Sequence, residues 1–281
     1  MANYGIQDIK ELREATGAGM SDVKKALDEA DGNRDKALEI IRVKGLAKAE
    51  KRGDKDTAEG LISYTIVKGG KGQIGYLAEL KCETDFVAKT DKYIKLGNDI
   101  VEAIAKADET DTKKALSLKI GSESIEEAIK LLSGTVGEKI ELASITKVDA
   151  PGVSVYAHST AIGTPPVIGV LVGLSAEAPE AGKAIAQHIA AFSPEYLDSD
   201  SVTPADIERE KSVAKEKALA DGKPENIVDK IVDGFLKSFF KDVVLLDQAL
   251  ATDPSITVGK YADKNGVEIL EFKRVRVGGE A

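Results

Sequence analysis

The chain has very few of the residues that build disulfide frameworks and zinc sites. Among its 281 residues there is one cysteine, Cys82, and there are two histidines, His158 and His188. A disulfide within one chain needs two cysteines, and a structural zinc site needs four cysteine or histidine ligands. These counts exclude both kinds of cross-link. A chain of this length can bury a core large enough to fold without them.

The sequence also lacks an excess of positive charge and a long uninterrupted apolar run. Its 39 Lys and Arg side chains are outnumbered by 48 Asp and Glu, which leaves a net charge of −9. A negative field of this size repels phosphates, so we expect neither nucleic acid nor membrane as a direct partner. Residues 150–176 carry no charged side chain, but Pro165-Pro166 interrupts the continuity that a spanning helix requires. Asp8 and Glu11 argue against a targeting segment, so we expect a cytoplasmic location.

Motifs for chemistry on a small molecule are absent as well. The Walker sequence GxxxxGK[ST] does not occur, and a hairpin turn explains the glycines at 69, 70 and 72 better than phosphate binding does. Neither histidine has a Ser or Cys nucleophile near it in a recognisable pattern. Cys82 is interpreted as a small core residue, and His188 as a half-buried residue of an apolar helix. We therefore predict no enzyme activity, no cofactor and no metal site.

What the sequence does contain begins with a helical module. The length predicts roughly two domains, and apolar residues at helical spacing predict three helices within residues 1–50. Thr16-Gly17-Ala18-Gly19 and Asp31-Gly32-Asn33 separate the helices, and Asn33 offers an N-cap for the third. Residues 51–60 are charged or small, and we expect a linker there.

From residue 61 onward the pattern predicts an α+β core. Alternating residues predict strands over 61–67 and 73–80, followed by helices and further strands. The segment IGYLAEL at 74–80 resembles IGVLVGL at 168–174, and each leads into a helix. Two related halves or a chance match would both explain this similarity. We assign 61–148 to a first core subdomain, and 149–203 together with 243–281 to a second.

Residues 204–242 predict an inserted antiparallel helical hairpin. Two helical segments flank Asp221-Gly222-Lys223-Pro224, a turn with glycine after one helix and proline in the first turn of the next. The second helix has a wide apolar face, while the first has few apolar residues and many charged ones. The first helix therefore cannot cover the whole apolar face of the second. The uncovered part can pack against the core of the protein or against another chain, so self-association through the hairpin is one expectation.

One segment, Thr84-Asp85-Phe86-Val87-Ala88-Lys89, admits two interpretations. In the first, Thr84 caps a helix, Asp85 is a favourable acid in its first turn, and Phe86 enters the core. In the second, Phe86 stands at an exposed helix tip, where a large apolar ring is costly unless a partner receives it. The pattern alone favours the first interpretation and leaves the second open.

Two motifs together resemble those of the bacterial elongation factor Ts family. The first is Cys82 with the TDFVA run at 84–88, and the second is LREATGAGM at 12–20 followed by KKAL at 24–27. The similarity extends through Gly222-Lys223-Pro224 and covers nearly the whole chain. It implies an N-terminal three-helix, ubiquitin-associated-like (UBA-like) module, two related α+β core subdomains and a projecting helical hairpin.

The resemblance also implies a function, which is guanine-nucleotide exchange on the GTPase elongation factor Tu in its GDP-bound and nucleotide-free forms. By the same resemblance, the segment that dislodges Mg²⁺ in the partner consists of Thr84, Asp85, Phe86 and Val87, with Phe86 as the wedge.

The resemblance also implies that three further residues of this chain contact the partner, because of their positions in the sequence. Leu12 and Met20 fall where the module of family members meets the GTPase domain, although both also fit a helical core. In the sequence, His158 is close to the position at which family members have a loop histidine that contacts the partner. The segment between His158 and the next strand, residues 159–167, is long here. The alternative function is a non-catalytic adaptor that binds a peptide or a ubiquitin-like partner through its N-terminal helices.

Overall fold

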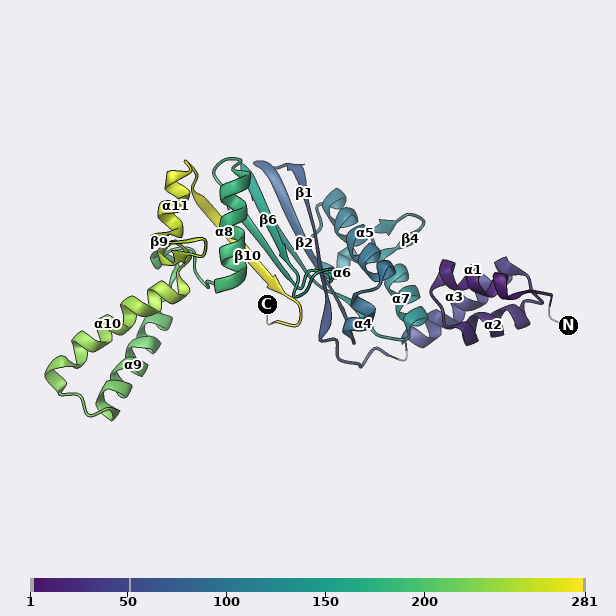
Figure 1. Cartoon of the computed structure of the whole chain (residues 1–281), viewed down its shortest axis with the longest axis horizontal. Helices are drawn as coiled ribbons and strands as arrows, with labels where there is room; N and C mark the ends of the chain where they lie inside the picture. The colour runs from purple at the N-terminus through teal and green to yellow at the C-terminus, as the bar shows by residue number, and fades with distance from the viewer. Residues whose placement is uncertain (1–2, 51, 280–281) are drawn as a thin grey trace.

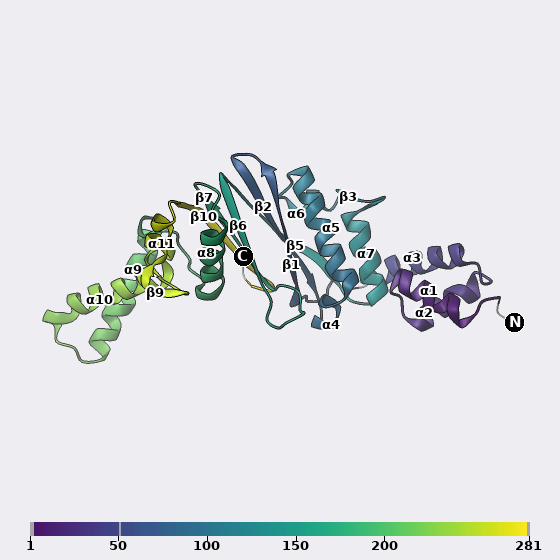
Figure 2. The same cartoon turned by 45° about the horizontal axis from the view of Figure 1, so that its top comes forward.

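The structure, a computed structural model, describes residues 3–50 and 52–279. A helical module, a core of two sheets flanked by helices, and a helical hairpin follow one another along the longest axis of the molecule (Figure 1). The module with the N-terminus lies at one end, and the hairpin lies at the other (Figure 2). The fold is α+β, as the sequence predicts.

The module consists of α1 (Ile6–Thr16), α2 (Met20–Glu29) and α3 (Arg34–Glu50). Gly17 ends α1 in the left-handed backbone region, with φ 77°. Asn33 begins α3, because its Oδ1 accepts a hydrogen bond of 3.0 Å from the backbone N–H of Lys36. The three expected helices therefore share one small core, formed by Leu12, Ala18, Val23, Ala26, Leu27, Ala30, Ala37 and Ile41.

The first half of the core is a three-stranded antiparallel sheet in the order β1-β2-β5. The strands are β1 (Glu59–Gly69), β2 (Gly72–Cys82) and β5 (Ile140–Ala150). Two helices, α5 (Asp91–Ala107) and α7 (Ile125–Val136), cover one face and bury Tyr76, Leu80, Tyr93 and Ile100 against it. The smaller elements of this half are α4 (Asp85–Ala88), α6 (Thr112–Ala115), β3 (Lys119–Ile120) and β4 (Glu123–Ser124).

The glycines between β1 and β2 form a tight hairpin turn, as predicted. Gly69 is opposite Gly72 in the strand register, and Gly70 has φ 54°. A Cβ at Gly70 would lie 2.3 Å from a carboxylate oxygen of Asp149. That carboxylate accepts a hydrogen bond of 2.8 Å from the N–H of Lys71. Position 70 therefore needs a positive φ and no side chain, and only glycine meets both requirements.

The second half is another three-stranded antiparallel sheet, in the order β10-β7-β6. Its strands are β6 (Gly152–His158), β7 (Ile168–Leu174) and β10 (Ile269–Arg276). β5 ends at Ala150 and β6 begins at Gly152, so the chain passes from the first sheet to the second through Pro151. The other elements are α8 (Pro179–Phe192), the 3-10 turns Ser199–Ser201 and Leu245–Asp247, β8 (Ala249–Leu250), β9 (Asp253–Thr257) and α11 (Val258–Lys264).

The two sheets pack face to face, and the repeated segments lie at equivalent places in them. The strands β2 and β7, which contain 74–80 and 168–174, are the central strands of their sheets. The second residue of each segment is a glycine that admits the opposite sheet. A Cβ at Gly75 would lie 2.7 Å from the side chain of Leu171, and a Cβ at Gly169 would lie 2.6 Å from that of Ile62. The similarity therefore has a common physical cause in the packing of the sheets.

The hairpin consists of α9 (Pro204–Ala220) and α10 (Glu225–Val243). It is joined to the core where Tyr196 Oη donates a hydrogen bond of 2.7 Å to Asp206. Val228 and Leu236 of α10 are buried, whereas Val213 and Ile227 are 49% and 39% exposed. Within the described residues, no helix of the chain is long and apolar enough to cross a membrane.

The segment expected as a linker runs between α3 and β1 and is held against the core. Arg52 Nε donates a hydrogen bond of 2.6 Å to the carbonyl of Gly137, and buried Thr57 hydrogen-bonds Glu141.

One expectation is corrected by the structure, because His188 is fully buried rather than half-buried. Its Nδ1 accepts from the N–H of Ala251 at 3.1 Å, so Nε2 carries the proton and donates to Gln248 at 2.8 Å. Such polar contacts between distant segments leave no periodic signal in the sequence.

A candidate partner-binding tip on helix α4

The segment predicted to act on a partner forms the tip of the short helix α4. Thr84 occupies the N-cap position with an extended backbone, directly after β2. Val87 and Ala88 are 8% and 3% exposed and belong to the core of the first half, whereas Phe86 is 81% exposed. One face of this single turn is thus anchored in the core while the ring points into solvent. The exposed position, and not the core position, holds for Phe86.

The hydroxyl of Thr84 does not act as the cap that the sequence favours, because it is used elsewhere. Thr84 Oγ1 donates a hydrogen bond of 2.6 Å to Glu138 Oε1, and the N–H of Thr84 donates one of 3.0 Å to Glu138 Oε2. A carboxylate is a stronger acceptor for this hydroxyl than a backbone group is. Glu138 lies between α7 and β5, and sequence reasoning missed it because it is 54 positions away from Thr84.

Asp85 keeps a negative charge beside the exposed ring. Lys89, one turn further along, donates a hydrogen bond to Asp85 Oδ2 and lowers the pKa of this carboxyl below its usual range. The pair is open to solvent, so it contributes little to stability. Its consequence is local, since an ionised carboxylate stands next to an apolar ring at the tip.

Cys82 supports the tip from inside the protein. Its side chain is fully buried, and Sγ donates to the carbonyl oxygen of Thr84 at 3.2 Å. Burial raises the pKa of the Cys82 thiol to about 11, so the thiol is protonated at neutral pH and is a poor nucleophile. The interpretation of Cys82 as a small core residue is confirmed.

The two residues of the module assigned to docking have opposite environments. Leu12 is 0% exposed in the core of the module, so its assignment to a partner surface is corrected. Met20, the first residue of α2, is 59% exposed and open to a partner. Helical spacing placed both on an apolar face, but it could not distinguish the centre of that face from its edge.

His158 ends β6, and its Nδ1 lies 3.1 Å from the hydroxyl of Tyr156. The loop after it, residues 159–167, contacts β1, because the N–H of Ile62 donates to the carbonyl of Pro166 at 2.8 Å. The helix α4 also packs against β1. Ile162 in this loop is fully exposed, which the sequence did not predict.

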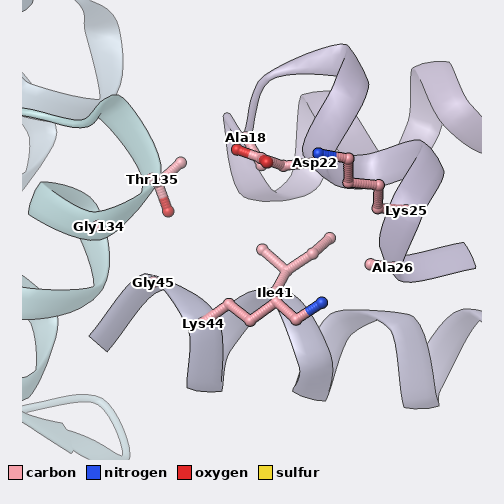
Figure 3. Close-up of a pocket in the computed structure, with 9 residues that line it drawn as sticks. All are labelled: Ala18, Asp22, Lys25, Ala26, Ile41, Lys44, Gly45, Gly134 and Thr135. Carbon is pink, nitrogen blue, oxygen red and sulfur yellow. The ribbon is translucent and has the colours of Figure 1, made fainter. Parts of the chain in front are cut away.

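The module reaches the core through a close contact between α3 and α7. A Cβ at Gly134 would lie 1.9 Å from the carbonyl oxygen of Gly45, so the two backbones touch. Beside this contact is a cavity of about 190 Å³, lined by Lys25 and Lys44 of the module and Thr135 of α7 (Figure 3). Within the described residues, the structure contains no group of three or more His, Cys, Asp or Glu side chains that could hold a metal ion.

Aromatic side chains are enriched in the cores of protein–protein interfaces, so an exposed ring on an anchored helix tip fits a contact with another protein. Comparisons with known proteins define the class further, as a translation elongation factor. A family model described as Elongation factor TS matches residues 83–279. Elongation factor Ts of Micrococcus luteus is 45% identical over 281 residues, which cover 99% of this chain and 100% of that relative.

Two further relatives agree. Elongation factor Ts of Beutenbergia cavernae is 44% identical over 280 residues, with 99% of this chain and 100% of the relative covered. The corresponding protein of Acidothermus cellulolyticus is 43% identical over 278 residues, with 99% of each covered. The chain belongs to the elongation factor Ts family, which confirms the resemblance drawn from its motifs.

Proposed function

We propose that the chain is a guanine-nucleotide exchange factor for elongation factor Tu and that it presses the α4 tip into the nucleotide-binding domain of that GTPase. Membership of the elongation factor Ts family supports the exchange role. The observation that carries the mechanism is Phe86, whose ring is 81% exposed although the next two residues are anchored in the core. The helix turn therefore stays anchored in the core while the ring of Phe86 inserts into a partner.

The ring supplies the driving force for insertion. Burying a phenylalanine side chain contributes about 1.5–3 kcal/mol relative to leaving it in water. About 1.4 kcal/mol corresponds to a factor of ten in an equilibrium constant. Insertion of Phe86 can thus offset a loss of nucleotide affinity of roughly ten- to a hundredfold.

The target of the insertion is the Mg²⁺ site of the partner. Mg²⁺ requires near-octahedral oxygen ligands at about 2.0–2.1 Å, so a small displacement of a supporting element spoils its coordination. Loss of the ion removes positive charge that faces the GDP phosphates. In this proposal Phe86 is the wedge, Asp85 makes a polar contact beside it, and Thr84 and Val87 hold the tip in place.

The exchange cycle follows from thermodynamic linkage. A factor that weakens GDP binding must itself bind less tightly once nucleotide is present. Incoming GTP therefore displaces the chain, which forms no covalent bond during the cycle. Met20 at the start of α2 adds a second contact, through a flexible thioether that adapts to the partner surface.

The test is the release of fluorescently labelled GDP from elongation factor Tu, measured by stopped flow at increasing concentrations of the chain. We expect Phe86→Ala to lower the maximal release rate roughly ten- to a hundredfold. Its unfolding free energy should stay within about 0.5 kcal/mol of wild type, as for other surface substitutions. The matched control is Phe192→Ala, which removes a ring that is 55% exposed in the other half of the core.

The results separate the parts of the proposal. If the wild-type chain leaves GDP release unchanged, the exchange function is wrong and the adaptor alternative stands. If Phe86→Ala accelerates release as well as wild type does, only the wedge is wrong. Met20→Ala should raise the concentration for half-maximal release and leave the maximal rate unchanged, because Met20 is assigned to docking alone.

A further inference from the structure

We infer that Glu138 is a positioning residue for exchange: its carboxylate holds Thr84 so that Phe86 projects from a fixed point. The inference rests on the proposed role of Phe86. Glu138 accepts from both the hydroxyl and the backbone N–H of Thr84, at 2.6 and 3.0 Å. Two hydrogen bonds from one residue to one carboxylate fix both its side chain and its backbone.

Glu138 is itself held in the turn that follows directly after α7. Gly137 ends that helix in the left-handed region with φ 79°, and its N–H donates to the carbonyl of Ser133 at 2.8 Å. The hydroxyl of buried Ser133 donates to the carbonyl of Glu138 at 2.6 Å. The carboxylate therefore extends from a fixed backbone, and the position of α7 is passed on to α4.

A second carboxylate makes the opposite connection. Glu83, the residue before Thr84, accepts from the N–H of Lys139 at 2.6 Å. Arg52 Nε donates to the carbonyl of Gly137 at 2.6 Å and lies 3.5 Å from Glu83 Oε1. The segments 83–84 and 137–139 thus exchange hydrogen bonds in both directions, and Arg52, which follows α3 of the module, bridges them.

A helix of four residues needs such support from outside. A single turn has too few internal hydrogen bonds to be stable by itself. Val87 and Ala88 anchor the far side of α4, but its start is held by Glu138. Without Glu138, Thr84 can bond to water instead, so the fold persists while the ring loses its fixed direction. Misplacement of an acting group by about 1 Å can cost roughly a hundredfold in rate.

The experiment compares Glu138→Ala with Glu138→Gln in the full chain. A glutamine oxygen can accept from the N–H of Thr84 while its amide donates to Thr84 Oγ1, so both contacts survive without the charge. We expect Glu138→Ala to lower the maximal rate of labelled-GDP release from elongation factor Tu roughly tenfold, at an unchanged half-saturating concentration. Glu138→Gln should restore the rate to within about threefold of wild type. The control is Glu126→Ala, which removes an exposed acid in the first turn of α7.

A double variant shows whether Glu138 acts through the ring. Adding Glu138→Ala to Phe86→Ala should lower the rate by less than about twofold further, because residues that act as one unit are not additive. A full additional tenfold loss, or wild-type exchange by Glu138→Ala, would overturn the inference. If Glu138→Ala fails to fold, Thr84→Val, which removes the hydroxyl donor, must give a partial loss that also vanishes without the ring.

The two proposals fail in different ways. If Phe86→Ala retains full exchange, the wedge itself is wrong, whatever Glu138 does. If Phe86→Ala is impaired and Glu138→Ala is not, the wedge stands and only the positioning role of Glu138 is wrong. If Glu138→Gln is as impaired as Glu138→Ala, the charge and not the geometry is what matters, and the inference is overturned.

Discussion

At the scale of single residues, neighbours in the sequence have opposite environments. Cys82 is fully buried beneath the tip, while Phe86, four positions later, has its ring in solvent. The change occurs because β2 ends at Cys82 and the chain turns into α4 at the edge of the core. Cys82 is therefore tested by its chemical reactivity, and Phe86 by its effect on a partner.

For Cys82, we expect slow alkylation by iodoacetamide at pH 8. Burial raises its pKa from 9.0 to about 11, which lowers the thiolate fraction about a hundredfold relative to an unfolded chain. The measurement is the rate of modification of the native chain, followed by mass spectrometry, against the same chain in denaturant. Equal rates in the two states would contradict the buried, protonated thiol.

For His188, we expect a pH-dependent contribution to stability. Burial lowers the pKa of its imidazole below the usual 6.5, and protonation would break the bond that Nδ1 accepts from Ala251. The unfolded chain takes up a proton as the pH falls through about 6.5, and the folded chain takes it up only at a lower pH. The contribution is thus complete above that pH and is lost progressively below it.

The measurement for His188 is urea unfolding between pH 7.5 and 5.5. Stability of the wild type should fall more steeply in this window than that of His188→Gln, whatever the absolute stability of the variant. His158→Gln, which changes the histidine at the end of β6, serves as the comparison. Parallel curves for wild type and His188→Gln would contradict the assignment.

At the scale of elements, the contact between α3 and α7 decides where the module lies. Each helix supplies a glycine to the contact, Gly45 and Gly134, so the two backbones meet without side chains between them. The turn that carries Glu138 follows directly after α7. The position of the module and that of the tip therefore depend on the same helix.

Gly134→Ala tests this contact. A Cβ there would lie 1.9 Å from the carbonyl oxygen of Gly45, so the helices must separate, and we expect a loss of about 1–3 kcal/mol. The measurements are thermal unfolding and small-angle scattering. The control is Gly234→Ala in α10, where a Cβ meets open space and a gain of roughly 0.5–1 kcal/mol is expected. Two variants with the same melting temperature would show that α3 and α7 are not in close contact.

At the scale of the whole molecule, the exposed groups of the proposed interface lie in one half. The module with Met20, the first sheet and α4 occupy that half, and the hairpin projects from the other end (Figures 1 and 2). We expect elongation factor Tu to slow amide hydrogen exchange at the start of α2 and in α4, and to leave the turn Asp221–Pro224 unchanged. Protection of that turn with none in α4 would place the interface elsewhere.

Self-association through the hairpin stays a prediction at this scale. The exposed apolar residues available for it include Val213, Leu219 and Ile227. Light scattering at rising concentration should show a mass above the 29.8 kDa of one chain, and Ile227→Lys should return it to that value. A constant mass of one chain at all concentrations would contradict the prediction.

The elements and the family were predictable, and the contacts between them were not. The hairpin turn at Gly69–Gly72, the cap of α3 at Asn33 and the two helices of 204–242 all follow from signals within a few residues. Short elements such as β8, β9 and α11 were missed, because they have too few residues for a periodic pattern. The full burial of His188 was misjudged and that of Leu12 was left open for a different reason, since burial depends on what packs from elsewhere.

By itself, then, the sequence determined the periodic elements, the turns, the absence of cross-links and the family, because these depend on local geometry and composition. The tertiary structure alone decided that Phe86 is exposed and Leu12 buried, and that a carboxylate 54 positions away holds Thr84. The physical reason is that exposure and long-range hydrogen bonds arise only when distant segments meet. No local pattern encodes which segments those are.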